Sequence, residues 1–217
     1  EYRFTYDYNL EELSNYKKLT SLTLSGLGLR DLNQIANLTN LRDLTVRPYY
    51  SRVSSVLRIE EGYRDSRLED FTGLSNLRNL STLDLSGTKI NDISVLANLT
   101  NLESLSFSGT KINDISVLAN LANLKSLIIF DSLFNDISVL TALSDLEIIK
   151  ITGMPPQSLP DLSGFKNLHT LNFAGSQNGE INITNIPNLK ELDLSSTWAS
   201  TITANDLPNL QNLNLRR

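Results

Sequence analysis

The chain of 217 residues contains no cysteine and a single histidine, His169. The lack of cysteine excludes disulfides, thiolate metal ligands and cysteine nucleophiles, and one histidine argues against histidine catalysis or a histidine metal cluster. No apolar run reaches the ~18 residues that would indicate a membrane span, and the opening residues do not resemble a signal peptide. We therefore expect no metal, no cofactor and no segment inserted into a membrane.

An excess of basic residues is also missing. Lysine and arginine number 19 against 24 aspartates and glutamates, which gives a net charge of −5 at pH 7. Because nucleic-acid-binding proteins usually present a basic field, this balance disfavours a nucleic-acid partner. The sequence also lacks a glycine-rich phosphate loop and the H-E-x-x-H and G-x-S-x-G motifs, so we expect no enzyme and no catalytic residue.

What the sequence does have is repetition. The segment SGTKINDISVLANL occurs twice without change, at residues 86–99 and 108–121. Leucines continue this spacing of 22 or 21 residues in both directions, apart from one longer interval, and each is followed by L-x-x-L-x-L or a close variant. The nine starting leucines are Leu19, Leu41, Leu80, Leu102, Leu124, Leu146, Leu168, Leu189 and Leu210. Such a period with this motif predicts a leucine-rich repeat fold.

Each repeat predicts a short strand followed by a tight outer segment. Apolar and polar residues alternate over residues 83–85, as in a strand, whereas apolar residues recur every three positions over 90–99. The second spacing suits a 3₁₀ helix or irregular coil better than an α-helix. An aspartate column just before this segment can cap its first turn. Its members are Asp70, Asp92, Asp114 and Asp136. Stacking should place a parallel sheet on the concave side of a solenoid and 3₁₀ helix or coil on the convex side.

These residues resemble a known family. The stretch NLTNLESLSFSGTKINDISVLANLANLKSL closely resembles the 22-residue repeats of bacterial internalin-like proteins. As a repeat class the resemblance covers about residues 10–215, and it is strongest over 68–146. It implies a non-enzymatic protein-binding module that is secreted or attached to the surface of a bacterium and that often engages a host protein.

One column departs from the family pattern. The family usually has asparagine at the turn after the strand, and here most repeats carry a hydroxyl residue, which makes only part of the hydrogen bonds of an asparagine. The column consists of Thr88, Thr110, Ser132, Met154, Ser176 and Thr197.

The two ends of the solenoid are expected to differ from its middle. Aromatic residues alternate over residues 2–8, so residues 1–18 predict an N-terminal cap and half repeat. The segment GEINITNIPNLKELDL differs from earlier repeats, so the outer side of the last two units should differ. Because the chain starts without methionine and stops directly after a strand, we expect a fragment with a truncated C-terminus.

The longer interval indicates an insertion. From Leu41 to Leu80 is 39 residues, which places 17 extra residues within 47–67. This segment holds five of the eleven arginines and three of the seven tyrosines, and its charge of +2 leaves −7 for the rest. Tyrosine and arginine are enriched in binding hot spots. We predict partner-binding residues here, and a solvated loop that binds nothing is the alternative. They are Arg47, Tyr49, Tyr50, Arg52, Arg58, Tyr63 and Arg64.

The concave face carries a second departure. Its residues are mostly small and polar, but Ile128 and Phe130 stand where other repeats have aspartate or serine, and Ile148 and Lys150 follow one repeat later. Together they predict an apolar patch with one cation, and such patches tend to mark partner sites. The alternative is that β-propensity alone selected these residues. The predicted concave-face residues are Asp84, Ser106, Ile128, Phe130, Ile148, Lys150, Asn172 and Asp193. The single tryptophan, Trp198, is expected to pack into the last repeats, with a surface hot spot as the alternative.

Three functions fit this sequence. The first hypothesis is a binding module of a bacterial secreted or cell-surface protein, which holds a protein through its concave face and insertion, with a glycan left open as ligand. The second is a structural spacer that projects another domain of a larger surface protein. The third is an intracellular scaffold that binds and regulates an enzyme. The oligomeric state stays open in each.

Overall fold

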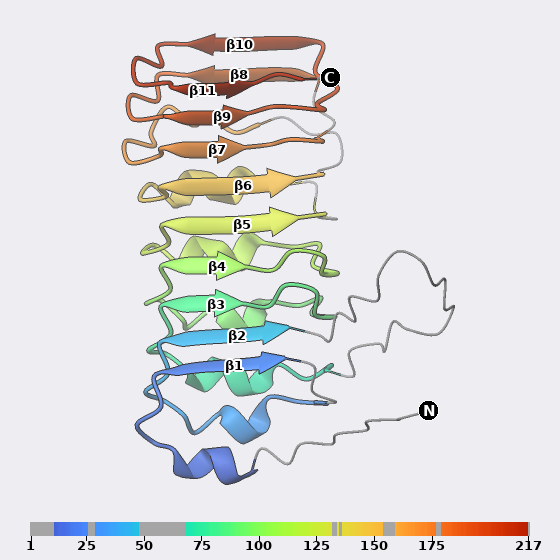
Figure 1. The fold of residues 1–217 in the computed structure, drawn as a ribbon, viewed down its shortest axis with the longest axis vertical. Helices are drawn as coiled ribbons and strands as arrows, with labels where there is room; N and C mark the ends of the chain where they lie inside the picture. The colour runs from blue at the N-terminus through green and yellow to red at the C-terminus, as the bar shows by residue number, and fades with distance from the viewer. Residues whose placement is uncertain are drawn as a thin grey trace, which may run out of the picture.

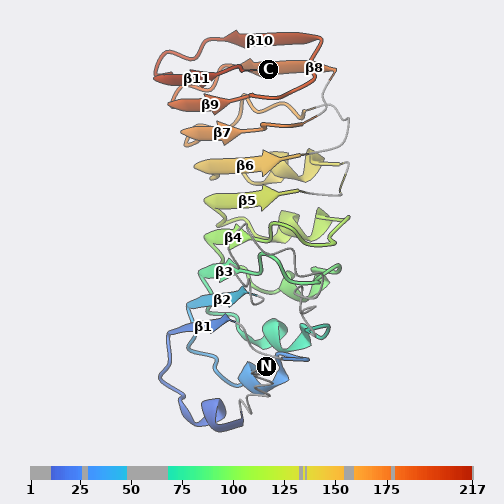
Figure 2. The same cartoon turned by 45° about the vertical axis from the view of Figure 1, so that its right-hand side comes forward.

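The structure is a computed structural model that describes residues 11–25, 29–47, 68–131, 134, 136–153, 159–176 and 179–216. Nine parallel strands stack along the molecule into one sheet (Figure 1 and Figure 2). They are β1 (Ser21–Ser25), β2 (Asp43–Arg47), β3 (Thr82–Asp84), β4 (Ser104–Ser106), β5 (Ser126–Phe130), β6 (Ile148–Thr152), β7 (Thr170–Asn172), β9 (Glu191–Asp193) and β11 (Asn212–Asn214). This sheet confirms the predicted leucine-rich repeat solenoid and its number of repeats.

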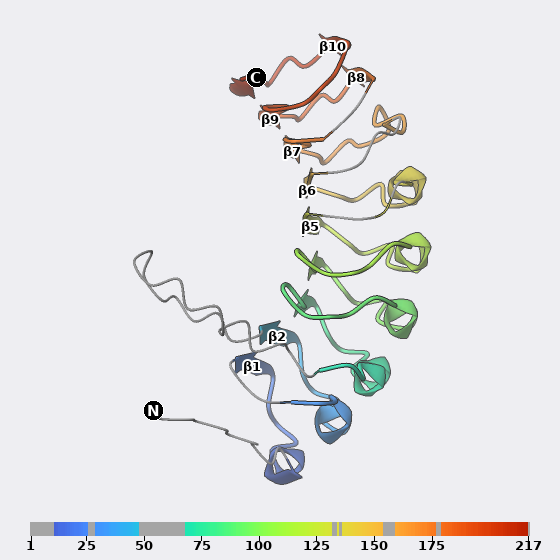
Figure 3. The ribbon, with the colours of Figure 1, turned by 90° about the vertical axis from the view of Figure 1, so that its right-hand side faces the viewer.

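Short 3₁₀ helices cover the opposite side of the first six repeats, as Figure 3 shows. They are η1 (Glu11–Asn15), η2 (Asn33–Ile35), η3 (Thr72–Asn76), η4 (Ser94–Leu96), η5 (Ser116–Asn120) and η6 (Ser138–Ala142). Each of the four predicted cap aspartates accepts a hydrogen bond, through Oδ1, from the backbone N–H two residues later at 2.8 Å. Asp31 and Asp161 do the same at 2.9 Å. The predicted caps are therefore confirmed, and two further repeats use them.

The apolar core runs between the sheet and the outer segments and includes buried side chains from Leu24 to Ala199. The strand-centre side chains of Leu83, Leu105 and Leu127 are at most 1% exposed. Full burial of one such side chain is worth about 1.5–3 kcal/mol. Because each repeat buries its leucines largely against its two neighbours, the fold is stable only as a stack.

An asparagine ladder joins six of the repeats to the preceding one on the outer flank of the sheet. In six repeats the side-chain Nδ2 donates to a backbone carbonyl of the preceding repeat. These residues are Asn40, Asn79, Asn101, Asn123, Asn188 and Asn209. Asp145 occupies the same column, and its carboxylate has no N–H to donate.

The last two repeats carry strands on the outer side instead of 3₁₀ helices. β8 (Glu180–Thr184) and β10 (Thr201–Asn205) pair in parallel as a separate two-stranded sheet. In β8 the isoleucines Ile181 and Ile183 are buried, while Asn182 between them is exposed. This alternation with a period of two residues favours a strand. The expected difference at the C-terminal end is confirmed, and 3₁₀ helix or coil describes the convex side only up to these repeats.

Several predictions lie partly outside the described residues. Of the expected N-terminal cap, the structure describes η1 and the turn that leads to β1, whereas residues 1–10 lie outside. Of the insertion, only Arg47 is described, as the last residue of β2, and the chain is described again from Leu68. Beyond it, η3 and β3 resume the repeat, and β3 pairs with β2 as one repeat pairs with the next.

Candidate functional site

The strand register places most of the predicted concave-face residues in a single row. Residues at the same position of neighbouring strands lie side by side from β3 to β9. This row consists of Asp84, Ser106, Ile128, Lys150, Asn172 and Asp193. Ile148 and Phe130 lie in the two flanking rows, so all eight predicted residues face the same side of the sheet.

The apolar patch consists of Ile128, Phe130 and Ile148 on the adjacent strands β5 and β6. Ile128 is opposite Lys150 in the register. Phe130 is 39% exposed, and the other three side chains are half-buried. Both strands extend over five residues, whereas their neighbours β4 and β7 extend over three. The structure therefore brings the four predicted residues together on the longest pair of neighbouring strands that the nine-stranded sheet has beyond the insertion.

A side-chain turn ends three of the shorter strands. In β3, β7 and β9 the Oδ1 of Asp84, Asn172 and Asp193 accepts a hydrogen bond from the backbone N–H two residues later, at 2.8–2.9 Å. Such a bond turns the chain away from the sheet. Isoleucine and lysine offer no oxygen for it, so β5 and β6 continue. Three predicted binding residues thus have a structural role that the sequence reasoning missed, although the N-x-A and D-x-S spacing signals it.

The two aspartates of this row stay ionised. Burial by itself raises the pKa of Asp84, but hydrogen bonds from Ser86, followed by the Arg47 guanidinium, hold the pKa below its ordinary value. Burial likewise raises the pKa of Asp193, and hydrogen bonds from Ser195 and Asn214 lower it further than burial raises it. The row therefore carries negative charge on either side of Lys150.

Arg47 links the start of the insertion to the inner face. Its Nη2 lies 2.7 Å from Oδ2 of Asp84, and its Nε donates to the same oxygen at 3.1 Å. The arginine side chain is 60% exposed, whereas that of Asp84 is 15% exposed. Two residues predicted for separate surfaces therefore form one ion pair. The other predicted insertion residues lie outside the described residues: Tyr49, Tyr50, Arg52, Arg58, Tyr63 and Arg64.

A chain of serine hydroxyls runs from Ser106 toward the patch. The hydroxyls of Ser106 and Ser86 are 2.8 Å apart, and Ser86 accepts from the N–H of Ser108 at 3.2 Å. The hydroxyl of Ser108 in turn accepts from the N–H of Phe130 at 3.0 Å. Ser86 and Ser108 were not predicted, and they hold the backbone that presents Phe130.

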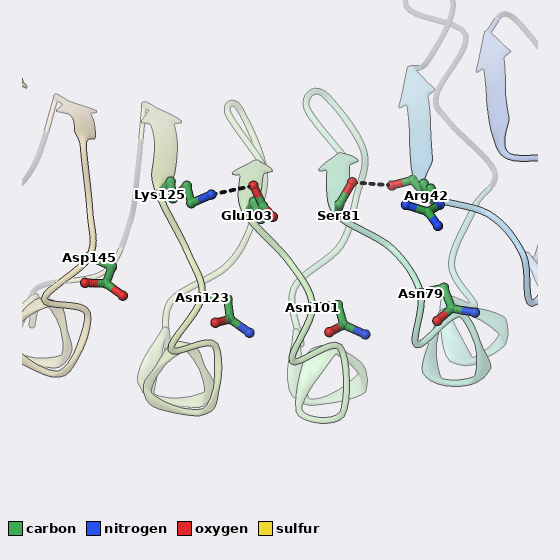
Figure 4. Close-up of a pocket in the computed structure, with 8 residues that line it drawn as sticks. All are labelled: Arg42, Asn79, Ser81, Asn101, Glu103, Asn123, Lys125 and Asp145. Atoms are coloured by element: carbon green, nitrogen blue, oxygen red, sulfur yellow. Dashed lines mark hydrogen bonds and ion pairs between the residues drawn. The ribbon is translucent and has the colours of Figure 1, made fainter. Parts of the chain in front are cut away.

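A shallow polar groove lies along the N-terminal ends of strands β2 to β6, beside the asparagine ladder (Figure 4). Its volume is about 430 Å³. The Nζ of Lys125 lies 2.9 Å from Oε2 of Glu103 within it, and this bond with the charge of Glu103 raises the pKa of Lys125. The lining residues are Arg42, Asn79, Ser81, Asn101, Glu103, Asn123, Lys125 and Asp145. Because its polar groups largely bind one another or the backbone, the groove offers no nucleophile with an adjacent base.

The prediction for Trp198 is wrong. Its side chain is 80% exposed in the segment between β9 and β10, although burial in the last repeats was expected. The backbone explains the difference, because the N–H of Trp198 donates to the carbonyl of Ser176 and the buried positions on either side belong to Thr197 and Ala199. The ring therefore points away from the core.

Across the described ranges, no three histidine, aspartate or glutamate side chains come together as metal ligands would. The only histidine has its Nε2 3.8 Å from Glu147, and its Nδ1 is hydrogen-bonded to Thr170, so His169 lies between repeats. In the same part of the chain, no helix has the length and apolar character needed to cross a membrane.

Solved structures share this architecture. The internalin InlF of Listeria monocytogenes matches with a TM-score of 0.66 and 27% identity, over 96% of this chain and 71% of that one. The internalin InlC2 of the same organism matches with a TM-score of 0.69 and 23% identity, over 93% of this chain and 83% of that one. The chain is an internalin-like leucine-rich repeat protein. No protein-family model matches its sequence, and a comparison with curated proteins gives no match.

The likeness to these internalins concerns their bacterial source and the kind of solenoid that they form. These two internalins are bacterial, and the repeats of this chain build the kind of solenoid that serves as a protein-interaction module. The patch on β5 and β6 is where this internalin-like solenoid departs from the small polar residues of its own repeats. That departure distinguishes one part of the inner face from the rest.

Proposed function

We propose that this chain is a non-enzymatic protein-binding module of a bacterial secreted or cell-surface protein, and that it holds its partner on the inner face at the apolar patch. The observation that carries the proposal is the register of Ile128, Phe130 and Ile148, which gathers three apolar side chains on adjacent strands. A face of serine, threonine and aspartate surrounds them, so burial of the patch by a partner is favourable and local. Arg47, the first residue of the insertion, is bound to this surface by its ion pair with Asp84.

Differential binding to an array of purified extracellular proteins tests the proposal. The array is probed with the wild-type chain, with the double variant Ile128→Asp, Phe130→Asp, and with the double variant Ala119→Asp, Ala142→Asp. The two alanines are exposed on the outer helices η5 and η6, so the second variant adds the same charge on the opposite side. Circular dichroism checks that both variants fold.

A protein that binds the wild-type chain and the outer-side variant, but not the patch variant, supports the proposal. Equal binding to all three chains would remove the inner patch from the binding surface. Absence of any bound protein would favour a structural spacer.

A further inference from the structure

The charged side chains of the inner face and its edge are mostly engaged within the chain. Arg47 pairs with Asp84 at 2.7 Å, and Lys125 pairs with Glu103 at 2.9 Å. Asp193 binds the backbone of its own turn. A partner that meets these groups would have to displace existing bonds, so they contribute little to the choice of partner.

Lys150 is different. No carboxylate of the described residues lies within ion-pair distance of its ammonium group. It is half-buried, with Ile128 on one neighbouring strand and Asn172 on the other. The stem of a lysine packs on apolar side chains while its charged end reaches solvent. The ammonium group therefore stands at the border of the apolar patch with no partner in the described chain.

Asn172 adds a second donor beside it. Its Oδ1 accepts from the N–H of Ala174 at 2.8 Å, and its side-chain NH₂ group remains as a donor. Lys150 and Asn172 are register partners on neighbouring strands about 4.8 Å apart, so both side chains can reach one carboxylate. Asp84 on β3 and Asp193 on β9, the strand next to Asn172, repel an incoming acidic group, so its carboxylate is favoured toward Lys150 and away from either aspartate.

We infer that the partner presents an acidic side chain next to an aliphatic or aromatic one, with the apolar side chain on the patch and the carboxylate on Lys150 and Asn172. This inference rests on the proposed function and adds the chemistry of the partner. The segment recognised is a polypeptide with aspartate or glutamate beside leucine, isoleucine or phenylalanine. A basic segment would be repelled by the ammonium group of Lys150 at the border of the patch.

Selection from a displayed library of random linear peptides tests the inference. Peptides enriched on the wild-type chain are measured by fluorescence anisotropy against Lys150→Glu, Lys150→Arg and the patch variant Ile128→Asp, Phe130→Asp. Lys166→Glu is the matched control, because Lys166 is exposed at the outer flank and engages its neighbour only through its backbone carbonyl. We expect enriched peptides with an acidic residue next to an apolar one. Lys150→Glu should weaken them about ten- to a hundredfold, since a hydrogen bond to a charged group is worth about that factor.

The control and Lys150→Arg should bind within a few-fold of the wild-type chain. Replacing the acidic residue of the peptide by lysine should restore binding to Lys150→Glu. Enriched peptides that lack acidic residues but lose binding in the patch variant would overturn the inference and leave the proposed function intact. Peptides that bind the patch variant as tightly as the wild-type chain would count against both the inference and the proposed function. Failure to enrich any peptide would also overturn the inference, because the site as described accepts a linear segment.

Discussion

Removing the hydroxyl of Ser176 should raise the stability of the protein, whereas removing that of Thr88 or Thr197 should lower it. All three residues occupy the column after the inner strand and are at most 8% exposed. Thr88 donates its hydroxyl to the carbonyl of Leu85 at 2.7 Å, and Thr197 donates to that of Leu194 at 2.8 Å. The hydroxyl of Ser176 has no hydrogen-bond partner among the described residues.

The magnitudes follow from what each change leaves behind. Thr88→Val keeps the volume and loses one bond, and the Leu85 carbonyl still accepts the N–H of Thr88 at 3.2 Å. The expected loss is therefore about 1 kcal/mol of unfolding free energy. Ser176→Ala relieves a buried unsatisfied hydroxyl worth about 1–3 kcal/mol. It also forfeits a few contacts of about 0.1–0.2 kcal/mol each. The net expectation is a gain of up to about 2 kcal/mol.

Urea unfolding followed by far-UV circular dichroism measures both changes. Tryptophan fluorescence is the poorer probe, because the ring of Trp198 is already 80% exposed in the folded chain. Thr197→Val serves as a second threonine in the same column. A Ser176→Ala variant less stable than the wild type by as much as Thr88→Val would refute the reasoning, since it would mean that the serine hydroxyl is hydrogen-bonded in solution.

Two further predictions concern stability. Hydrogen bonds from the backbone N–H and then the hydroxyl of Ser116 lower the pKa of Asp114 below its ordinary 3.8. The stability that ionised Asp114 contributes is therefore present above that pH and is lost as the pH falls through the lowered pKa. Acid titration by circular dichroism should show stability falling below about pH 4, and less steeply for Asp114→Asn, which keeps the acceptor but does not titrate. Gly109 has φ +65° with open space around a built Cβ, so Gly109→Ala should cost about 1–2 kcal/mol through backbone strain alone. Gly164 has no positive φ and equally open space, so Gly164→Ala should stabilise by about 0.4–1 kcal/mol in the same urea assay.

The sequence predicted the parts of the fold that a periodic pattern determines. A leucine every 22 residues can be buried only if the repeats stack. This requirement alone predicts that residue 128 lies beside residue 150, as the structure shows. The cap aspartates were also predictable, because each carboxylate accepts from an N–H only two residues later in the sequence. The apolar patch followed from the same register, so its position needed no tertiary information.

Other features depend on contacts that the 22-residue period does not determine. The ion pair between Arg47 and Asp84 joins residues on either side of the insertion, and no local spacing brings them together. Asp84 and Asn172 were predicted as surface groups, although their oxygens bind the backbone of their own turns. The exposure of Trp198 depends on which neighbours occupy the buried positions of one turn, and an average tendency of tryptophan to be buried does not decide it.

The change from 3₁₀ helices to strands on the outer side has a geometrical consequence for binding. A repeat with a helix outside and a strand inside is a wedge, because the helix needs more room than the about 4.8 Å between strands. The last repeats are slabs, since β8 and β10 are hydrogen-bonded neighbours just as β9 and β11 are (Figure 3). Wedges bend the stack and slabs keep it straight. The patch on β5 and β6 therefore lies in the bent part, where a rounded body can touch several strands at once.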